Sequence, residues 1–232
     1  SSDVCSSDLG DRFNFSADDC FSISVWLRPS TKQGRLSIVS RMLDGDDFFR
    51  GYTVQIVNGR PSLFLVNRFP DRMLQMEGET VLEPNQWHHL AVTYDGSRKA
   101  DGIKIYLNGD LEQQATKIDA LSEGEITNGQ PFWIGNGHPG AKFKGAIDEL
   151  RVFTRVLTEE EIGKLPGVAI ESLLLLADSE RSEEIDQRIE SHYLEHHAPE
   201  QWRTPFQLAR RLKAQVKAEQ AAIPTVMVMQ EQ

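Results

Sequence analysis

The stretch that decides the fold reads WHHLAVTYDG at residues 87–96 and IKIYLNGDLEQ at residues 103–113. Apolar and polar residues alternate in both segments, and a pair that favours a tight turn, Asp95-Gly96 or Asn108-Gly109, follows each alternating run. Alternation with a period of two is typical of a strand that buries one face. We therefore expect these residues to form successive strands of an antiparallel sheet.

The same pattern continues on both sides of this stretch, in residues 21–27, 36–40, 52–56, 62–66, 132–134 and 144–153. Asn58-Gly59 separates two of these segments and predicts a hairpin, because both turn positions need a positive φ. The short connections leave no room for crossover helices. The sequence therefore predicts a mainly β fold, a two-sheet antiparallel jelly-roll sandwich with a C-terminal helical extension. The expected core includes Phe21, Ile23, Val25, Leu90, Val92, Ile105, Leu107, Ile134, Ile147 and Val152.

Composition excludes several classes of protein. The chain has 232 residues, with 25 Lys+Arg against 35 Asp+Glu and a formal net charge of -10. A nucleic-acid-binding surface usually carries the opposite balance, so we expect no nucleic-acid partner. No apolar run approaches the ~20 residues of a membrane span, and two cysteines are too few for a disulfide scaffold.

The chain changes character near residue 166. All 17 glycines lie at or before Gly167, and the remaining residues are rich in Ala, Leu, Glu and Gln. The breaker pair Pro166-Gly167 marks the expected boundary between a jelly-roll domain over residues 10–165 and a helical segment over residues 166–232.

Helices are expected around and beyond this boundary. Thr158 and Glu161 form a capping-box pattern that predicts a short helix ending near Leu165. Ser182 suits the N-cap of a second helix, and a third is expected after Thr204-Pro205. Apolar residues at helical spacing form one stripe on the third helix, at Phe206, Ala209, Leu212, Val216 and Ile223.

The first nine residues, SSDVCSSDL, stand apart from the rest. They have no hydrophobic period and no positively charged start, so they do not form a signal peptide. The run resembles the translated end of a sequencing adaptor, and the alternative is a natural Ser/Asp linker. On the first interpretation Cys5 carries no information, and Cys20 is a lone thiol.

Five runs carry a resemblance to a known family. They read FSISVWLRP, WHHLAVTYDG, IKIYLNGDLEQ, FWIGN and FKGAIDELRVFTRVLTEEEI. In this order they resemble a laminin-G-like domain of the concanavalin A superfamily, over roughly residues 11–165. The resemblance implies a two-sheet jelly roll that binds carbohydrate or protein partners outside the cytoplasm, in some members with a calcium ion at the rim. It says little about the ligand, because function lies in loops on the sandwich.

Residues 169–232 carry a second resemblance, most specific in the octet PTVMVMQE at residues 224–231. They are similar to the beginning of a domain of unknown function in large planctomycete proteins that carry cytochrome-c-like modules. The resemblance implies that the chain is a fragment of a longer secreted protein, with flanking domains among its partners.

Glycoside hydrolysis is one candidate chemistry, since the superfamily contains glucanases. A retaining mechanism needs two carboxyl groups about 5–5.5 Å apart on one strand face. The nearest match is Ala146-Ile147-Asp148-Glu149-Leu150, where Ala146 replaces the first carboxylate. Strict alternation would place Ala146, Asp148 and Leu150 on one face and Glu149 on the other. We therefore expect no catalytic residues, with Asp148 and Glu149 holding turns or pairing with Arg151.

Calcium is the one cofactor that the sequence suggests. Asp44, Asp46 and Asp47 supply three carboxylates within four residues, between two expected strands. Calcium binds six to eight oxygen atoms, often from such a loop. The spacing does not fit an EF-hand, and a solvated acidic turn is the alternative.

Aromatic side chains near loops are the candidates for ligand binding. Phe48, Phe49, Phe69 and Trp133 lie near predicted strand ends, where a ring can stack on a sugar. Packing in the core is the alternative for each of them. Trp26 and Trp87 lie in the middle of predicted strands and are assigned to the core.

These observations favour a non-enzymatic module that recognises carbohydrate or protein partners within a larger secreted protein. A structural spacer in a multidomain cytochrome-associated or degradative enzyme is the alternative, and a degenerate glycoside hydrolase is a third.

Overall fold

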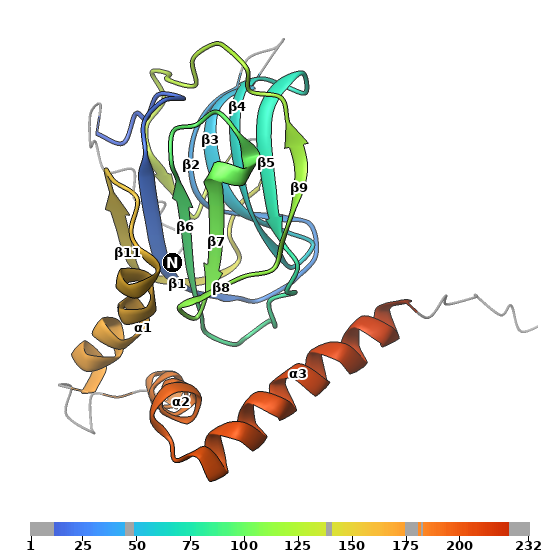
Figure 1. Cartoon of the computed structure of the whole chain (residues 1–232), viewed down its shortest axis with the longest axis vertical. Helices are drawn as coiled ribbons and strands as arrows, with labels where there is room; N and C mark the ends of the chain where they lie inside the picture. The colour runs from blue at the N-terminus through green and yellow to red at the C-terminus, as the bar shows by residue number, and fades with distance from the viewer. Residues whose placement is uncertain (1–11, 45–48, 138–140, 175–180, 182, 223–232) are drawn as a thin grey trace, which may run out of the picture. The chain divides into compact units, whose positions relative to one another are not determined.

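The computed structural model describes residues 12–44, 49–137, 141–174, 181 and 183–222 (Figure 1). The chain divides into two compact units, and the division falls after Ala169. The first unit contains all the strands, and the second contains only helices.

Two antiparallel sheets form the first unit (Figure 1). The five-stranded sheet has the order β11-β1-β6-β7-β8, and the six-stranded sheet has the order β10-β2-β3-β4-β5-β9. The predicted two-sheet antiparallel sandwich is therefore confirmed. The strands are β1 (Phe21–Pro29), β2 (Arg35–Asp44), β3 (Phe49–Val57), β4 (Arg60–Arg68), β5 (Arg72–Gly78), β6 (His88–Tyr94), β7 (Ile103–Leu107), β8 (Asp110–Leu111), β9 (Gln114–Asp119), β10 (Trp133–Ile134) and β11 (Gly145–Phe153), with a short 3-10 helix η1 (Ala100–Gly102) before β7.

Tight turns set the register of the hairpins. Asn58 and Gly59 have φ values of 49° and 86°, and Asn108 and Gly109 have values of 55° and 94°. Asparagine and glycine tolerate this left-handed region better than other residues do, as the sequence predicted for both turns. The first turn aligns Val57 with Arg60, and every later pair of β3 and β4 follows from that pairing.

The main core lies between the two sheets. All ten residues expected there belong to it or pack against it. Aromatic rings fill one end of this core, where Phe15 stacks on Phe21 with ring centroids 4.6 Å apart. Tyr52 and Tyr94 are fully buried beside Phe21, and each hydroxyl donates a hydrogen bond to a backbone carbonyl.

A helix covers part of the outer face of the five-stranded sheet. The helix α1 (Glu159–Leu174) begins with the predicted capping box, because the amide of Thr158 donates to Glu161 and the amide of Glu161 donates to Thr158. Its first turns and the preceding residues bury Ala91 and Tyr106 beneath Leu157 and Ile162.

Two expectations about this sheet were wrong. The helix does not end near Leu165, since it continues through Pro166, which is buried and close to Gly109. Favourable packing at that position offsets the hydrogen bond that proline removes. The assignment of both tryptophans to the core between the sheets was also wrong. Trp26 is buried outside that core, with its ring edge-on to His89. Trp87 lies just before β6 and is half-buried, with the Arg28 guanidinium 5.7 Å from the centre of its ring.

A bulge in β11 breaks the expected alternation. Ser24 pairs with Arg151 and Trp26 pairs with Asp148, so two residues of β11 lie opposite Val25. One of them, Glu149, has a φ of 51°. Leu150 consequently packs on the core together with Ile147, whereas strict alternation placed it on the face of Asp148.

The second unit contains the helices α2 (Glu183–His192) and α3 (Glu200–Ala222), joined through a π-helical turn η3 (Tyr193–His197). Helix α3 begins before Thr204-Pro205 rather than after it, with Pro205 inside its second turn. Trp202, Leu208 and Leu212 are exposed. Among the described residues, no helix is both long enough and apolar enough to cross a bilayer.

Replacing Ile105 by Ala tests the core assignment. Ile105 is fully buried between the sheets, so the substitution should lower the free energy of unfolding by ~2–5 kcal/mol through lost transfer energy and a residual cavity. Chemical denaturation measures the change. Lys104→Ala, at an exposed neighbour on the same strand, is the control and should change stability by less than about 0.5 kcal/mol. Equal losses in both variants would contradict the assignment.

Candidate functional site

Apolar side chains on the outer face of the six-stranded sheet form a second cluster, separate from the main core. In β4, Leu63 and Leu65 face the core, and the intervening Phe64 and Val66 face the opposite way. Phe64, Val66 and Met73 are buried even though they lie on the outer face. Less buried side chains surround these three, namely Met42, Phe49, Val57 and Ile118. We call these seven residues the outer cluster.

Strand register extends this face across the whole sheet. Trp133 pairs with Ser40, Ser40 pairs with Thr53, and Thr53 pairs with Phe64. Residues directly opposite one another in adjacent strands point to the same side of a sheet. Trp133 therefore lies on the face of the outer cluster, at the opposite edge of the sheet, and its neighbour Ile134 packs on the core.

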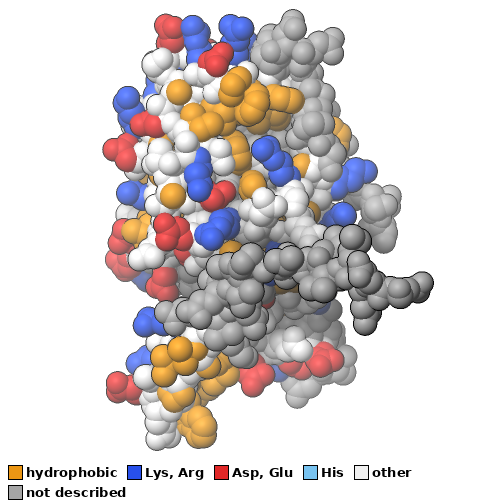
Figure 2. Space-filling model, turned by 90° about the vertical axis from the view of Figure 1, so that its right-hand side faces the viewer, with side chains coloured by type: hydrophobic (Ala, Val, Ile, Leu, Met, Phe, Trp, Pro, Cys, Tyr) orange, Lys and Arg blue, Asp and Glu red, His pale blue; other side chains and the backbone are white. Residues whose placement is uncertain are grey.

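Two phenylalanines project at one end of the outer cluster. The rings of Phe49 and Phe69 meet edge to face, with centroids 5.8 Å apart and an interplanar angle of 79°. Phe69 is 46% exposed. Figure 2 shows hydrophobic side chains gathered toward the upper end of this side of the molecule. The structure thus brings together two of the four predicted aromatic residues. Trp133 lies on β10, three strands from β4, which ends just before Phe69.

Gly51 lies within the outer cluster, where it pairs with Met42 on one side and Val66 on the other. Its φ is +138°, and a Cβ atom there would come within 1.9 Å of the carbonyl oxygen of Arg41. Only glycine fits this backbone conformation. The outer face therefore has no side chain on β3 between Met42 of β2 and Val66 of β4.

Polar side chains occupy the part of the face away from the phenylalanine pair. Ser37, Gln55, Ser62 and Glu77 follow one another in register across four strands. The Glu77 carboxylate accepts a hydrogen bond from Ser62 and forms an ion pair with Lys117 at 3.1 Å. Ser37, Gln55 and Ser62 are buried, so this row stabilises the sheet and does not offer its groups to solvent.

The sequence did not identify most of this face. It predicted Phe49 and Phe69 because they lie near loops, but it missed Phe64, Val66 and Met73. A signal was present in β4, where four consecutive apolar residues, Leu63 to Val66, predict burial on both faces.

The comparisons with known proteins agree with this architecture. A family model of the concanavalin A-like lectin/glucanases superfamily, Laminin_G_3, matches residues 5–163. The chain belongs to this family. Among its relatives are mouse pappalysin-1, 23% identical over 156 residues, and mouse pentraxin-related protein PTX3, 25% identical over 160 residues. These alignments cover 62% and 65% of the chain but only 9% and 39% of the relatives.

A solved structure shares the fold of the laminin-G-like unit. The binding domain of Paraclostridial Mosquitocidal Protein 1 superposes with a TM-score of 0.50 at 18% identity. The match covers 67% of this chain and 38% of that one.

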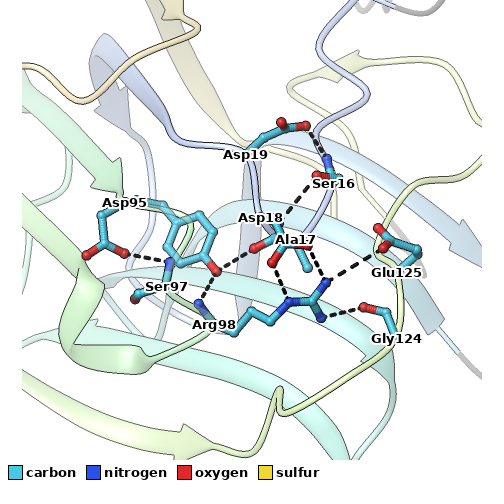
Figure 3. Close-up of polar contacts among 10 residues, drawn as sticks. Ser16, Ala17, Asp18, Asp19, Asp95, Ser97, Arg98, Gly124 and Glu125 are labelled. Atoms are coloured by element: carbon cyan, nitrogen blue, oxygen red, sulfur yellow. Dashed lines mark hydrogen bonds and ion pairs between the residues drawn. The ribbon is translucent and has the colours of Figure 1, made fainter.

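An arginine clamp fixes the loops at one rim of the laminin-G-like unit (Figure 3). The Arg98 guanidinium donates to both oxygens of Asp18, at 2.6 and 2.8 Å, and to the carbonyl of Gly124 at 2.7 Å. Its backbone amide donates to the Tyr94 hydroxyl, which itself donates to the carbonyl of Ala17. The clamp joins the segment before β1, the loop after β6 and the loop after β9.

Charge and burial shift the pKa values in the clamp. Hydrogen bonds from Arg98 lower the pKa of Asp18 below its ordinary value of 3.8, and burial raises the pKa of Tyr94 to about 12. A lowered carboxyl pKa contributes stability above 3.8, which is lost as the pH falls through the folded-state value. A raised phenol pKa contributes stability below 10.0, which is lost as the pH rises through about 12.

Replacing Asp18 by Asn tests the clamp. The variant should be less stable than wild type at neutral pH, and the difference should shrink as the pH falls below 3.8, because wild type then loses the same charge. Thermal melts across this range measure the effect. Asp110→Asn, at an exposed carboxylate on β8, is the control and should follow wild type throughout. A destabilisation of Asp18→Asn that does not change with pH would contradict the electrostatic explanation.

The predicted calcium residues lie largely outside the described residues. Asp46 and Asp47 are among those not described, as is Phe48. Asp44 ends β2, where its backbone pairs with Phe49. Within the described part of the chain, no three His, Cys, Asp or Glu residues are arranged to hold a metal ion. Calcium binding at the loop after β2 stays a prediction.

A thermal-shift measurement tests it. If Asp44, Asp46 and Asp47 bind calcium, a millimolar concentration should raise the melting temperature, because a ligand of the native state adds stability as RT ln(1 + [L]/Kd). The double variant Asp46→Ala, Asp47→Ala should lose this shift and Asp110→Asn should keep it. A shift retained in the double variant would place the ion elsewhere.

The acidic pair of β11 has a structural role. The Glu149 carboxylate accepts a hydrogen bond from Arg151 at 2.7 Å, and Asp148 accepts one from the backbone amide of Glu149. The expected pairing with Arg151 is therefore confirmed for Glu149. Both carboxyl groups stabilise the bulge.

Proposed function

We propose that the laminin-G-like unit is a non-enzymatic binding module that recognises a carbohydrate or protein partner through the outer face of its six-stranded sheet. The Phe49–Phe69 pair, in which Phe69 is exposed and Phe49 is half-buried, carries the proposal. A ring that is almost half exposed contributes little to the fold, whereas a ligand that covers it removes apolar surface from water.

The surroundings of the pair favour binding because they hold it in place. Phe49 packs on the outer cluster, whose central residues Phe64, Val66 and Met73 are buried. A rigid aromatic surface loses little conformational entropy when a ligand binds to it.

The family supports a binding role, and the solved structure that shares the fold is described as a binding domain. A hydrolytic role has less support, because Ala146 stands where a first carboxylate would be needed and Glu149 is paired with Arg151. We further propose that the module acts outside the cytoplasm within a larger protein. This proposal rests on family membership and on the resemblance of residues 169–232 to the start of a following domain.

A glycan array probed with the full chain, with Phe69→Ala beside it, tests the carbohydrate arm. A bound glycan should lose a few-fold to about tenfold in affinity in the variant, since an aromatic contact contributes roughly 0.5–1.5 kcal/mol. Leu111→Ala is the matched control, because Leu111 is an equally exposed apolar residue on the other sheet. Binding that Phe69→Ala leaves intact and Leu111→Ala abolishes would refute the proposed surface. A shortened glycan product would refute the non-enzymatic role.

A further inference from the structure

We propose that the second unit binds a divalent transition-metal ion of the zinc class between His192 and His197, at the turn that joins α2 to α3. The site lies wholly within the second unit, so it is independent of the binding surface proposed for the laminin-G-like unit. The inference follows from the separation of two imidazole rings and from the turn that brings them together.

The turn η3 is one residue wider than a turn of α-helix. The amide of Ala198 donates a hydrogen bond of 2.8 Å to the carbonyl of Tyr193, five residues earlier, whereas the bonds of an α-helix span four residues. The wider turn brings together side chains that are five residues apart. The rings of His192 and His197 consequently lie with their centroids 5.2 Å apart and their planes tilted by 56°.

Pro199 explains why the turn ends where it does. Ala198 is extended, with a φ of -64° and a ψ of 147°, as the residue before a proline prefers. The side-chain amide of Gln207 in α3 donates to the carbonyl of Glu195 at 3.3 Å, and Ala198 is buried. The turn is therefore held between two helices, and its backbone fixes the separation of the two rings.

The separation of the rings is the one that a shared tetrahedral ion requires. A zinc ion lies about 2.0–2.1 Å from a ligating imidazole nitrogen, and hence about 3.2 Å from the centre of the ring. Two such rings at a tetrahedral angle of about 109° have centres about 5.2 Å apart. The observed separation of 5.2 Å equals this value, and the tilt of the planes lets both rings face one ion.

The surroundings of the pair favour a cation. Helix α2 and the turn η3 follow one another without a break, so the pair lies at the carboxyl end of a helical run. The carbonyl groups at such an end carry partial negative charge. His197 is exposed and His192 is buried, so an ion can reach the pair from solvent while one ligand is already held by packing.

The donor atoms select the class of metal. Imidazole nitrogen suits zinc, copper and nickel, whereas calcium and magnesium prefer oxygen. Within the described residues no group of three His, Cys, Asp or Glu side chains could hold a metal ion, so water completes the coordination of an ion bound here. Such an ion would link the end of α2 to the turn and stabilise the native second unit.

Calorimetric titration of the full chain with zinc chloride tests the inference. The variant His197→Gln, at an exposed position that leaves the fold intact, should weaken zinc binding at least about tenfold, because even the loss of an outer-shell partner commonly lowers metal affinity about 10–100-fold. Glu200→Gln, at an exposed carboxylate nearby, is the matched control and should bind zinc like wild type. X-ray absorption of the zinc complex should show two imidazole nitrogens, and millimolar calcium should not displace the ion.

Every other result overturns the metal site. Zinc affinity that His197→Gln leaves unchanged, or a wild-type chain that binds no zinc, would mean that the two histidine rings only pack together. Equal losses in His197→Gln and Glu200→Gln would indicate nonspecific attraction of cations to a chain with a net charge of -10. Displacement by calcium would indicate oxygen ligands and a site elsewhere.

Discussion

The hairpin register set by Asn58-Gly59 is the constraint on which the rest of the six-stranded sheet depends. A slip of one residue between β3 and β4 would turn Leu63 and Leu65 away from the core and bring Phe64 and Val66 into it. Because β4 is apolar on both faces, the hydrophobic pattern alone distinguishes the two arrangements weakly. The left-handed conformations of the two turn residues determine the register, because they align Val57 with Arg60. The same turn therefore decides both which residues form the core and which form the proposed binding face.

The sequence was sufficient for the parts of the fold that depend on local chemistry. The sandwich, both Asn-Gly hairpins, the capping box of α1 and the ten core positions follow from periodicity and turn residues, which act over a few positions. It was insufficient where tertiary packing overrides a local preference. Pro166 normally ends a helix, yet contacts near Gly109 hold it within α1. The bulge at Glu149 shifts Leu150 to the core face, and no turn signal announces a bulge inside a strand.

For the candidate site, the sequence predicted individual residues but not the contacts between them. Phe49 and Phe69 are twenty residues apart, and their contact depends on the register between β3 and β4. The sequence could place each near a loop, but it could not show that they meet.

Stability by itself does not explain the outer face. The core between the sheets already buries large side chains from every long strand, and the outer face of a sheet exposed to water would ordinarily alternate to polar residues. The outer cluster instead buries Phe64, Val66 and Met73, and Phe69 remains almost half exposed beside Phe49. An exposed aromatic ring costs solvation free energy in the free protein. A ligand that covers the ring removes that cost, and for this reason we place the proposed binding surface at the phenylalanine pair.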